Sequence, residues 1–380
     1  MLVDLHAHYP MHLIPPEQAD TKSAVLAQKP DSRWKAIIVD LLSRLGNYQG
    51  PGGAPGVTVE LMRAGDVGAV LSVLYSPLDE MDLGLPYGSP PKPGYIDSVR
   101  DQIALVEGHV AKEPLGATVA HDAAALDAAI AAGETAIVHA IEGGFALGST
   151  AEEIDANVTE LAGRGVAYVT LAHLFWRGVA TNAPALPFLP DWLYRFVFPQ
   201  PDGVGLSPLG IAAARAMARE RVLVDITHMS ERAIADTFST LGPDVPVIAS
   251  HMACRFGKLT YNLTDDVIRE VGRRGGVMGV IACTHYMHDG LRRESQVKTF
   301  EDSMELVYAH VDRIRQVTGS DDHAAIGSDL DGWIKPALPG IEHLGHMRHV
   351  QDALATKYGA AVAEKISSGN LLALLRRAWR

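Results

Sequence analysis

The strongest constraint on the fold is an alternation of short apolar segments with amphipathic ones along most of the chain. Eight apolar segments have the length and β-branched content of buried parallel strands, and helical patterns lie between them. They cover residues 2–8, 68–76, 134–144, 166–174, 221–230, 245–253, 277–286 and 323–332. Eight such units in a row predict an α/β fold, a single (β/α)8 TIM barrel, over a doubly wound sheet.

Three stretches rich in proline or glycine interrupt this alternation and predict loop insertions after the first, second and fourth strands. The first, 9–57, contains a predicted helix at 31–45, and the second, 77–95, is predicted to be irregular. The third, 174–207, is rich in Phe, Trp, Leu and Pro and is expected to form a pocket wall, a lid or an oligomer contact. Residues 1–380 are therefore predicted to form one catalytic domain, with 9–57 and 174–207 as inserted regions near the site.

Side chains of the kinds that bind metal ions stand at the carboxyl ends of six of the eight predicted strands, and these ends meet at one mouth of a barrel. One histidine after a strand is usually a hydrogen-bonded structural residue, and a His-x-His pair alone can be a core or surface pair. Seven buried polar groups without partners would be costly, whereas a shared metal centre removes that cost. The seven are His6, His8, Glu142, His173, His228, His251 and Asp329.

The residue types indicate which ion would be bound. His6 and His8 are two apart in a strand, so they project to the same face. Imidazole and carboxylate ligands suit Zn²⁺ or a similar divalent ion, and the lack of thiolate ligands is typical of a site with open positions for water and substrate. Cys254 and Cys283 have no CxxC spacing, so neither a disulfide framework nor a thiolate zinc site is expected.

Charge and hydropathy exclude several classes of partner. The formal net charge is −12, and no Lys/Arg-rich run offsets it, which argues against nucleic acid as a partner. No apolar run reaches membrane-spanning length, and the first strand begins at residue 2, which leaves no room for a signal peptide. We therefore expect a cytoplasmic protein that acts on a small molecule and does not bind a membrane.

Several segments, in their order and strand-helix context, resemble the membrane (renal) dipeptidase family of the amidohydrolase superfamily. They are "AIEGG", "YVTLAHL", "GLSPLG", "LVDITHMS", "VIASHMACR", "NLTDDVIREVGRRGGVMGV", "AIGSDLDG" and "SGNLL". The resemblance covers most of the chain. It implies a TIM barrel, a zinc-dependent dipeptidase activity and a homo-oligomer, often a dimer.

The resemblance also implies a ligand set. Glu142 would bridge two zinc ions per subunit, with His6 and His8 on the more buried ion and His228 and His251 on the other. Other divalent ions are an alternative. A hydroxide held between the ions would attack the amide carbon.

Three further roles follow from the same resemblance. Asp329, beside the metals, would accept the proton of the hydroxide and pass it to the leaving amine. His173 would bind the scissile carbonyl and stabilise the oxyanion. Asp331 would have a structural role.

Two positions depart from the family pattern. His8 stands where the family has aspartate, which leaves the site one charge more positive, and we expect a more acidic metal-bound water. Tyr261 stands where an arginine usually holds the substrate carboxylate, and a phenol cannot form a bidentate charged contact. Arg255, Arg177 or Lys258 are candidates to replace it, with a loop salt bridge as the alternative for Arg255.

The sequence leaves three functions open. The first is a zinc-dependent hydrolase of a dipeptide or related small amide. The second uses the same metal chemistry on another bond, such as a lactam, a lactone or an N-acyl derivative. The third is a non-catalytic binding barrel, and the presence of every expected ligand together with His173 argues against it.

Overall fold

The computed structural model describes residues 1–13, 54–82, 84–112, 116–187, 189–332 and 337–379. The helix predicted at 31–45, and most of the 9–57 insertion, lie outside these residues. Within this insertion the structure describes a 3-10 helix at Tyr9–Leu13 that directly follows the first strand.

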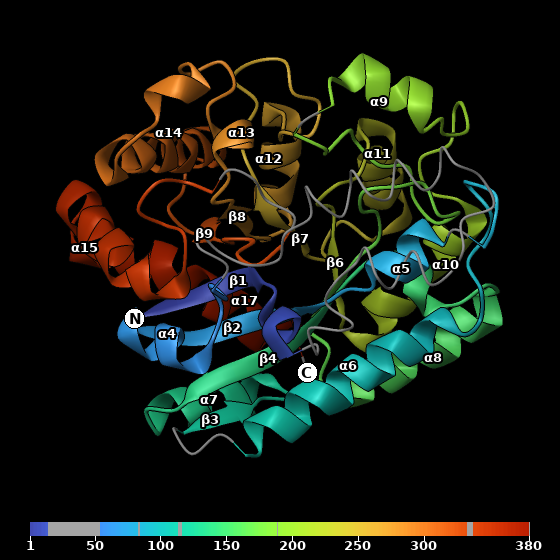
Figure 1. The fold of residues 1–380 in the computed structure, drawn as a ribbon, viewed down its shortest axis with the longest axis horizontal. Coiled ribbons are helices and arrows are strands. Elements are labelled where there is room, and N and C mark those ends of the chain that lie inside the picture. The colour runs from blue at the N-terminus through green and yellow to red at the C-terminus, as the bar shows by residue number, and fades with distance from the viewer. Residues whose placement is uncertain (14–53, 83, 113–115, 188, 333–336, 380) are drawn as a thin grey trace.

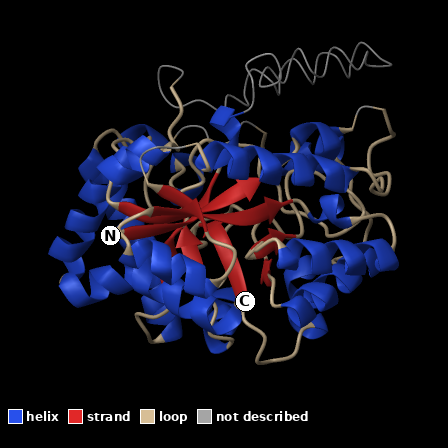
Figure 2. Cartoon of the chain, turned by 90° about the horizontal axis from the view of Figure 1, so that it is seen from below, coloured by secondary structure: helices blue, strands red, loops and turns tan. Residues whose placement is uncertain are grey.

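Eight parallel strands form a nearly closed barrel at the centre of the molecule, with helices around it (Figure 2). Neighbouring strands pair in the order β1-β2-β4-β5-β6-β7-β8-β9, and an isolated parallel bridge between Ala7 and Leu330 links the two ends. The strands are β1 (Leu2–Ala7), β2 (Val67–Leu74), β4 (Thr135–Glu142), β5 (Tyr168–Thr170), β6 (Leu223–Asp225), β7 (Val247–Met252), β8 (Met278–Val280) and β9 (Ala324–Ile326). The predicted barrel is confirmed.

One additional strand was not predicted from the sequence. The strand β3 (Ala117–Val119) pairs with β4 outside the barrel path, and helix α7 (Ala123–Ala131) follows it. Its three residues, Ala-Thr-Val, are too few to form the continuous apolar run that identified the other strands. They are also only partly buried.

Several of the helices that surround the barrel begin after a Ser, Thr or Asp residue whose side chain caps them. Ser207 accepts hydrogen bonds from the backbone N–H groups of Leu209 and Gly210, and Pro208 occupies the first helical position of α10. The main surrounding helices are α4 (Val59–Ala64), α6 (Tyr95–Val110), α8 (Ala151–Gly163), α10 (Pro208–Glu220), α11 (Glu231–Thr240), α12 (Asp265–Arg273), α14 (Phe300–Thr318), α15 (Met347–Tyr358), α16 (Ala360–Glu364) and α17 (Asn370–Ala378). Figure 1 shows α4, α6, α8, α10, α11, α12, α14 and α15 around the strands.

The packing of the first strand, β1, determines the direction in which His6 points. Every residue of β1 is buried, and Val3 and Leu5 pack with Leu371 and Leu375 of α17 on one face. The register of β1 against β2 shifts between Asp4 and Ala7, and His6 lies toward the barrel interior, where its Nδ1 is 2.7 Å from the hydroxyl of Tyr168. None of the described helices is long and apolar enough to cross a membrane.

Candidate active site

The carboxylate of Glu142, at the end of β4, lies at the centre of a group of buried histidines. It is 2% exposed, and each of its oxygens faces the Nε2 atoms of neighbouring rings. Oε1 lies 3.6 Å from Nε2 of His6, His228 and His251, and Oε2 lies 3.6 Å from Nε2 of His8 and 3.3 Å from Nε2 of His173. Five imidazoles thus converge on one carboxylate, from β1, the residue after it, β7, and the segments that follow β5 and β6.

The spacing of these atoms is that of ligands around an ion. A separation of 3.6 Å is too long for a hydrogen bond. Two ligands bound to one tetrahedral Zn²⁺ at their usual bond lengths stand about 3.4 Å apart. Oε1 of Glu142 and Nε2 of His6 are buried and have no hydrogen-bond partner among the described residues, and a cation between them would satisfy both.

Asp329 completes the group from the end of β9. Its Oδ1 lies 3.1 Å from Nε2 of His8 and 3.7 Å from Nε2 of His6. The Nε2 atoms of His228 and His251 face each other at 3.0 Å. The seven side chains predicted from the strand ends are therefore brought together, and we call them the metal cluster: His6, His8, Glu142, His173, His228, His251 and Asp329.

Burial keeps three of the histidines in the form that binds metal. Burial, assisted by the neighbouring rings, lowers the pKa of His6, His228 and His251 well below the ordinary histidine value, so these rings are neutral. Burial raises the pKa of Glu142. A group of neutral imidazoles around an acidic centre fits divalent cations such as Zn²⁺.

Outer hydrogen bonds set the orientation of two of the rings. Nδ1 of His6 lies 2.7 Å from the hydroxyl of Tyr168, and Nδ1 of His251 lies 2.9 Å from Oγ of Ser250. Ser250 in turn donates to Oδ2 of Asp225 at 2.6 Å, and Tyr168 donates to a backbone carbonyl. With both hydroxyl protons used in this way, each ring donates from Nδ1 and leaves its Nε2 lone pair toward the cluster.

The backbone at two ligand positions is strained. His228 (φ 65°) and Asp329 (φ 56°) lie in the left-handed region, which residues other than glycine seldom occupy. Asp331 (φ 60°) shares this conformation, and its carboxylate accepts hydrogen bonds from the backbone N–H groups of Gly56 and Val57 at 2.8–2.9 Å. Asp331 therefore anchors the end of the first insertion, as its predicted structural role requires.

Sequence reasoning missed Glu80. It lies on the short helix α5 (Pro77–Met81), within the segment predicted to be irregular. Its Oε2 accepts from Nδ1 of His173 at 2.8 Å and from the Tyr75 hydroxyl at 2.6 Å, and its Oε1 accepts from the backbone N–H of Phe175 at 2.9 Å. The Ser-Pro pair at 76–77 was a helix-start signal, like that of α10, that could have drawn attention to this segment.

Glu80 also affects the charge on His173. Burial alone lowers the pKa of this ring, but the negative charges of Glu142 and Glu80 outweigh burial and raise the pKa to about 9. Nε2 of His173 faces Glu142, so the ring presents that nitrogen to the centre of the cluster.

Comparison with known proteins agrees with this geometry. The sequence profile of the family described as membrane dipeptidase (peptidase family M19) matches residues 53–379. The chain belongs to the membrane dipeptidase family. The resemblance inferred from the motifs is thereby confirmed.

The individual relatives match only part of this chain. An "uncharacterized protein in pqqA 5'region" of Klebsiella pneumoniae is 30% identical over 47% of this chain and 64% of its own length. An "uncharacterized dipeptidase" of Schizosaccharomyces pombe is 32% identical over 47% of this chain and 38% of its own length. The matches thus span less than two thirds of these curated relatives.

A solved structure shares the fold over the whole chain. It is a metallopeptidase from Rhodobacter sphaeroides with a bound phosphinate mimic of the dipeptide L-Ala-D-Ala. The two chains align with a TM-score of 0.70 at 20% identity, over 100% of this chain and 99% of the other.

The residues proposed to replace the family arginine have other partners. Arg255 contacts Glu231 and donates to the backbone carbonyls of Asn262 and Thr260 at 3.0 and 2.7 Å, which is the loop salt bridge considered as its alternative. The Tyr261 hydroxyl donates to the carbonyl of His251 at 2.7 Å.

Arg177 also lies within a structural contact. Its Nη2 donates to the Tyr95 hydroxyl at 2.8 Å, its guanidinium lies over the Tyr95 ring, and it is 4% exposed. The substrate-binding roles of Arg255, Tyr261 and Arg177 stay predictions, and the hydrogen bonds described here already occupy part of each polar group.

Lys258, the third candidate, is exposed and lines a cavity of about 460 Å³. The remaining walls come mainly from the third insertion, including Leu186 and Leu189, and from Tyr286. Tyr286 stacks on Tyr261 with ring centroids 4.3 Å apart. Tyr286 thus separates this cavity, which we call the proline-rim cavity, from Tyr261, whose ring contacts that of His228 with centroids 5.1 Å apart.

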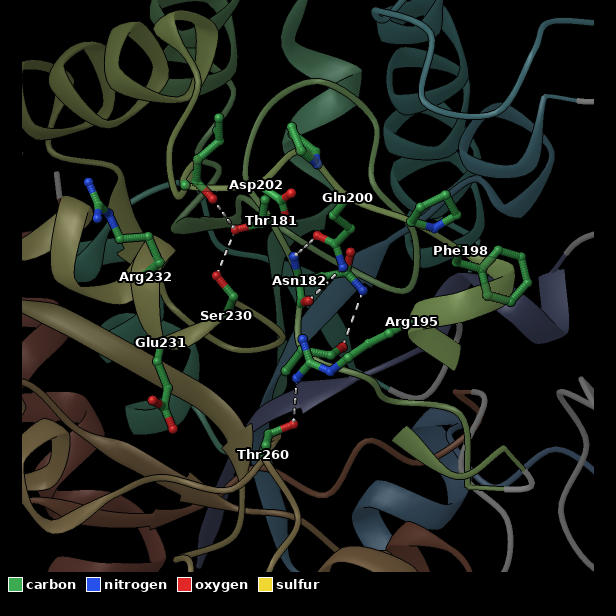
Figure 3. Close-up of a pocket in the computed structure, with 15 residues that line it drawn as sticks. Thr181, Asn182, Arg195, Phe198, Gln200, Asp202, Ser230, Glu231, Arg232 and Thr260 are labelled. Carbon is green, nitrogen blue, oxygen red and sulfur yellow. Dashed lines mark hydrogen bonds between the residues drawn. The ribbon is translucent and has the colours of Figure 1, made fainter. Parts of the chain in front are cut away.

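A second cavity, of about 610 Å³, is lined mainly by residues 181–183, 198–204 and 230–232 (Figure 3). Arg195, Arg232 and Ser230 line it. None of the residues of the metal cluster is among its lining residues, so we do not assign the hydrolytic site to it.

Proposed function

We propose that this protein is a zinc-dependent hydrolase that cleaves the amide bond of a dipeptide or a related small amide. The observation that supports it most is the convergence of five histidine Nε2 atoms on the two oxygens of Glu142, with Asp329 beside them. His6, His8, Glu142, His228 and His251 would hold the divalent ions of such a hydrolase.

Asp329 and His173 would supply proton transfer and stabilisation of the oxyanion. Divalent ions, when bound, polarise a carbonyl oxygen and lower the pKa of water. Asp329 would hold a proton at Oδ1 and release it to the leaving amine. His173, fixed by Glu80, would direct Nε2 at the substrate oxygen that becomes negative during attack.

The proposed substrates are small peptides, including those that contain a D-residue. The relative from Rhodobacter sphaeroides was solved with a mimic of an L,D-dipeptide, which supports testing this class here. We propose that a substrate carboxylate, where there is one, is met by Lys258, which has no ion pair among the described residues. Homodimer formation and a cytoplasmic location stay predictions.

The test combines metal analysis with a substrate panel. Purified tag-free protein should contain two zinc ions per chain and should hydrolyse L,L- and L,D-dipeptides with free carboxylates. Glu142→Gln should lose both metal and activity, because it removes the charge that both ions would share. The exposed Glu301→Gln, at the start of α14, serves as the matched control.

The second candidate function uses the same metals on a bond in a substrate without a carboxylate. It is favoured by the absence of a cation at the position of Tyr261, whose hydroxyl is held by a backbone carbonyl. Activity confined to C-terminally amidated peptides, lactams or lactones would select it. Bound metal without turnover of any compound would contradict both proposals.

A further inference from the structure

We propose that His285, His288 and Glu294 form a third divalent-cation site, separate from the metal cluster. His285 lies on helix α13 (Thr284–Met287), which follows β8, and His288 ends that helix. Glu294 begins the 3-10 helix at Glu294–Gln296. One atom from each of these residues lies within 4.8 Å of the other two.

The spacing within this group matches that of ligands on one ion. Nε2 of His288 lies 3.7 Å from Oε2 of Glu294, which is too long for a hydrogen bond. It is close to the 3.6 Å between His6 and Glu142 in the metal cluster. It is also close to the separation of about 3.4 Å expected for two ligands on a tetrahedral zinc ion.

The hydrogen bonds of the two rings leave nitrogen lone pairs available. Nδ1 of His288 lies 3.2 Å from the carbonyl oxygen of Arg292, which can only accept, so Nδ1 carries the proton and the neutral ring keeps its lone pair on Nε2. No hydrogen bond to the His285 ring is found within the described parts of the chain. His285 and His288 are three residues apart on a helical turn, so they share one face.

The surroundings of the site favour a cation. The carboxylates of Glu294, Asp289 and Asp191 lie near enough to His285 to act on its charge. Two imidazoles beside three carboxylates form a site that favours a cation, in a chain of formal charge −12.

The ligand types indicate the class of ion. Two imidazoles and one carboxylate suit Zn²⁺, Co²⁺ or Ni²⁺ better than Mg²⁺ or Ca²⁺, which prefer oxygen ligands. Three protein ligands leave room for water on the ion. A bound ion would join α13 to the following loop beside the proline-rim cavity, which His285 and Tyr286 help to line.

The alternative is a plain ion pair between His288 and Glu294. Both side chains are partly exposed, at 22% and 44%, and such a pair would stabilise the protein little. An ion pair requires no zinc, whereas a metal site binds one additional ion per chain. Counting bound ions therefore separates the two.

The experiment compares metal content in tag-free, full-length variants. After loading with zinc and removal of free metal, wild type should hold one more zinc per chain than His288→Ala or Glu294→Gln. His349→Ala, an exposed histidine in α15, should match wild type. In Co²⁺-loaded protein, the visible absorption of one Co²⁺ should be lost in His288→Ala and retained in His349→Ala.

The metal cluster is controlled separately by Glu142→Gln. If the cluster proposal fails, Glu142→Gln and wild type hold equal amounts of zinc, and the difference between wild type and His288→Ala is still measurable. Equal zinc content in wild type, His288→Ala and Glu294→Gln would overturn the third site. An extra ion that persists in both variants would be adventitious and would also overturn it.

Discussion

The carboxylate of Glu80 accepts a hydrogen bond from Nδ1 of His173 at 2.8 Å in a fully buried contact. Donors from Tyr75 and from the backbone of Phe175 hold the same carboxylate, so its position is fixed from three sides. Because Nδ1 is engaged, the ring turns Nε2 toward Glu142, 3.3 Å away. Glu80 thus positions a residue of the metal cluster without contacting Glu142.

Replacing Glu80 by glutamine should lower kcat by about 10- to 100-fold, the usual cost of losing such an outer partner. The substitution keeps the size of the side chain but removes the charge that orients His173. Steady-state kinetics should show the loss mainly in kcat, with KM and zinc content little changed. Glu152→Gln, at an exposed position in α8, should behave as wild type, and an unchanged kcat in Glu80→Gln would contradict the positioning role.

Replacing Ser250 by alanine should weaken zinc binding by about 10- to 100-fold. Ser250 connects Nδ1 of His251 to the buried carboxylate of Asp225, and alanine leaves both without this partner. Competition with a chromogenic chelator measures the affinity. The control is Ser239→Ala, because the Ser239 hydroxyl donates to the carbonyl of Ala235 on the exposed side of α11, away from the metal cluster, and this variant should retain wild-type affinity. Equal affinities in the two variants would show that the hydrogen bond from Ser250 does not support zinc binding.

The sequence predicted most of the metal cluster because parallel strands impose a shared geometry. His228 and His251 follow apolar runs at positions where neighbouring strands end, and strands of one barrel end at the same mouth. Their convergence on Glu142 therefore followed from the topology once the barrel was inferred. No site residue was predicted after the second strand, because Glu80 is not at the strand end. It lies on a short helix, five residues beyond Tyr75.

Residues of irregular loops could not be placed from the sequence. Whether Arg255 faces the substrate or its own loop depends on the path of the backbone at 255–263, where it contacts the carbonyls of Thr260 and Asn262. No periodicity specifies such a path. The strand β3 was missed for a related reason, since three half-buried residues carry too little pattern.

Gly332→Ala should disrupt the metal cluster by crowding. A Cβ at this position would lie 2.2 Å from Oδ1 of Asp329 and 2.9 Å from Nε2 of His8, so both side chains would have to move. A displacement of that order can reduce activity by about 100-fold. Gly108→Ala is the control, because its Cβ meets no atom within 4 Å and α6 should gain up to about 1 kcal/mol of stability. Wild-type kcat in Gly332→Ala would show that the cluster tolerates the shift.

His310 should make the folded protein sensitive to acid. It is fully buried in α14, where Nδ1 accepts from the backbone N–H of Cys254 and Nε2 donates to the carbonyl of Met287, both at 2.9 Å. Burial lowers its pKa from 6.5 to about 4. Between these values the unfolded chain binds a proton that the folded chain does not, so stability is complete above pH 6.5 and falls as the pH drops toward 4.

The loss over this window is about 3 kcal/mol, at roughly 1.4 kcal/mol per pKa unit. His310→Gln keeps an acceptor and a donor but does not titrate, so it should be less stable than wild type at pH 7.5 and lose less on acidification. Urea unfolding at several pH values, with a chelator present so that metal loss contributes equally, measures the difference. His349→Gln should show a difference from wild type that is independent of pH. If the gap between wild type and His310→Gln also stays constant from pH 7.5 to 4.5, the buried ring does not control the acid response.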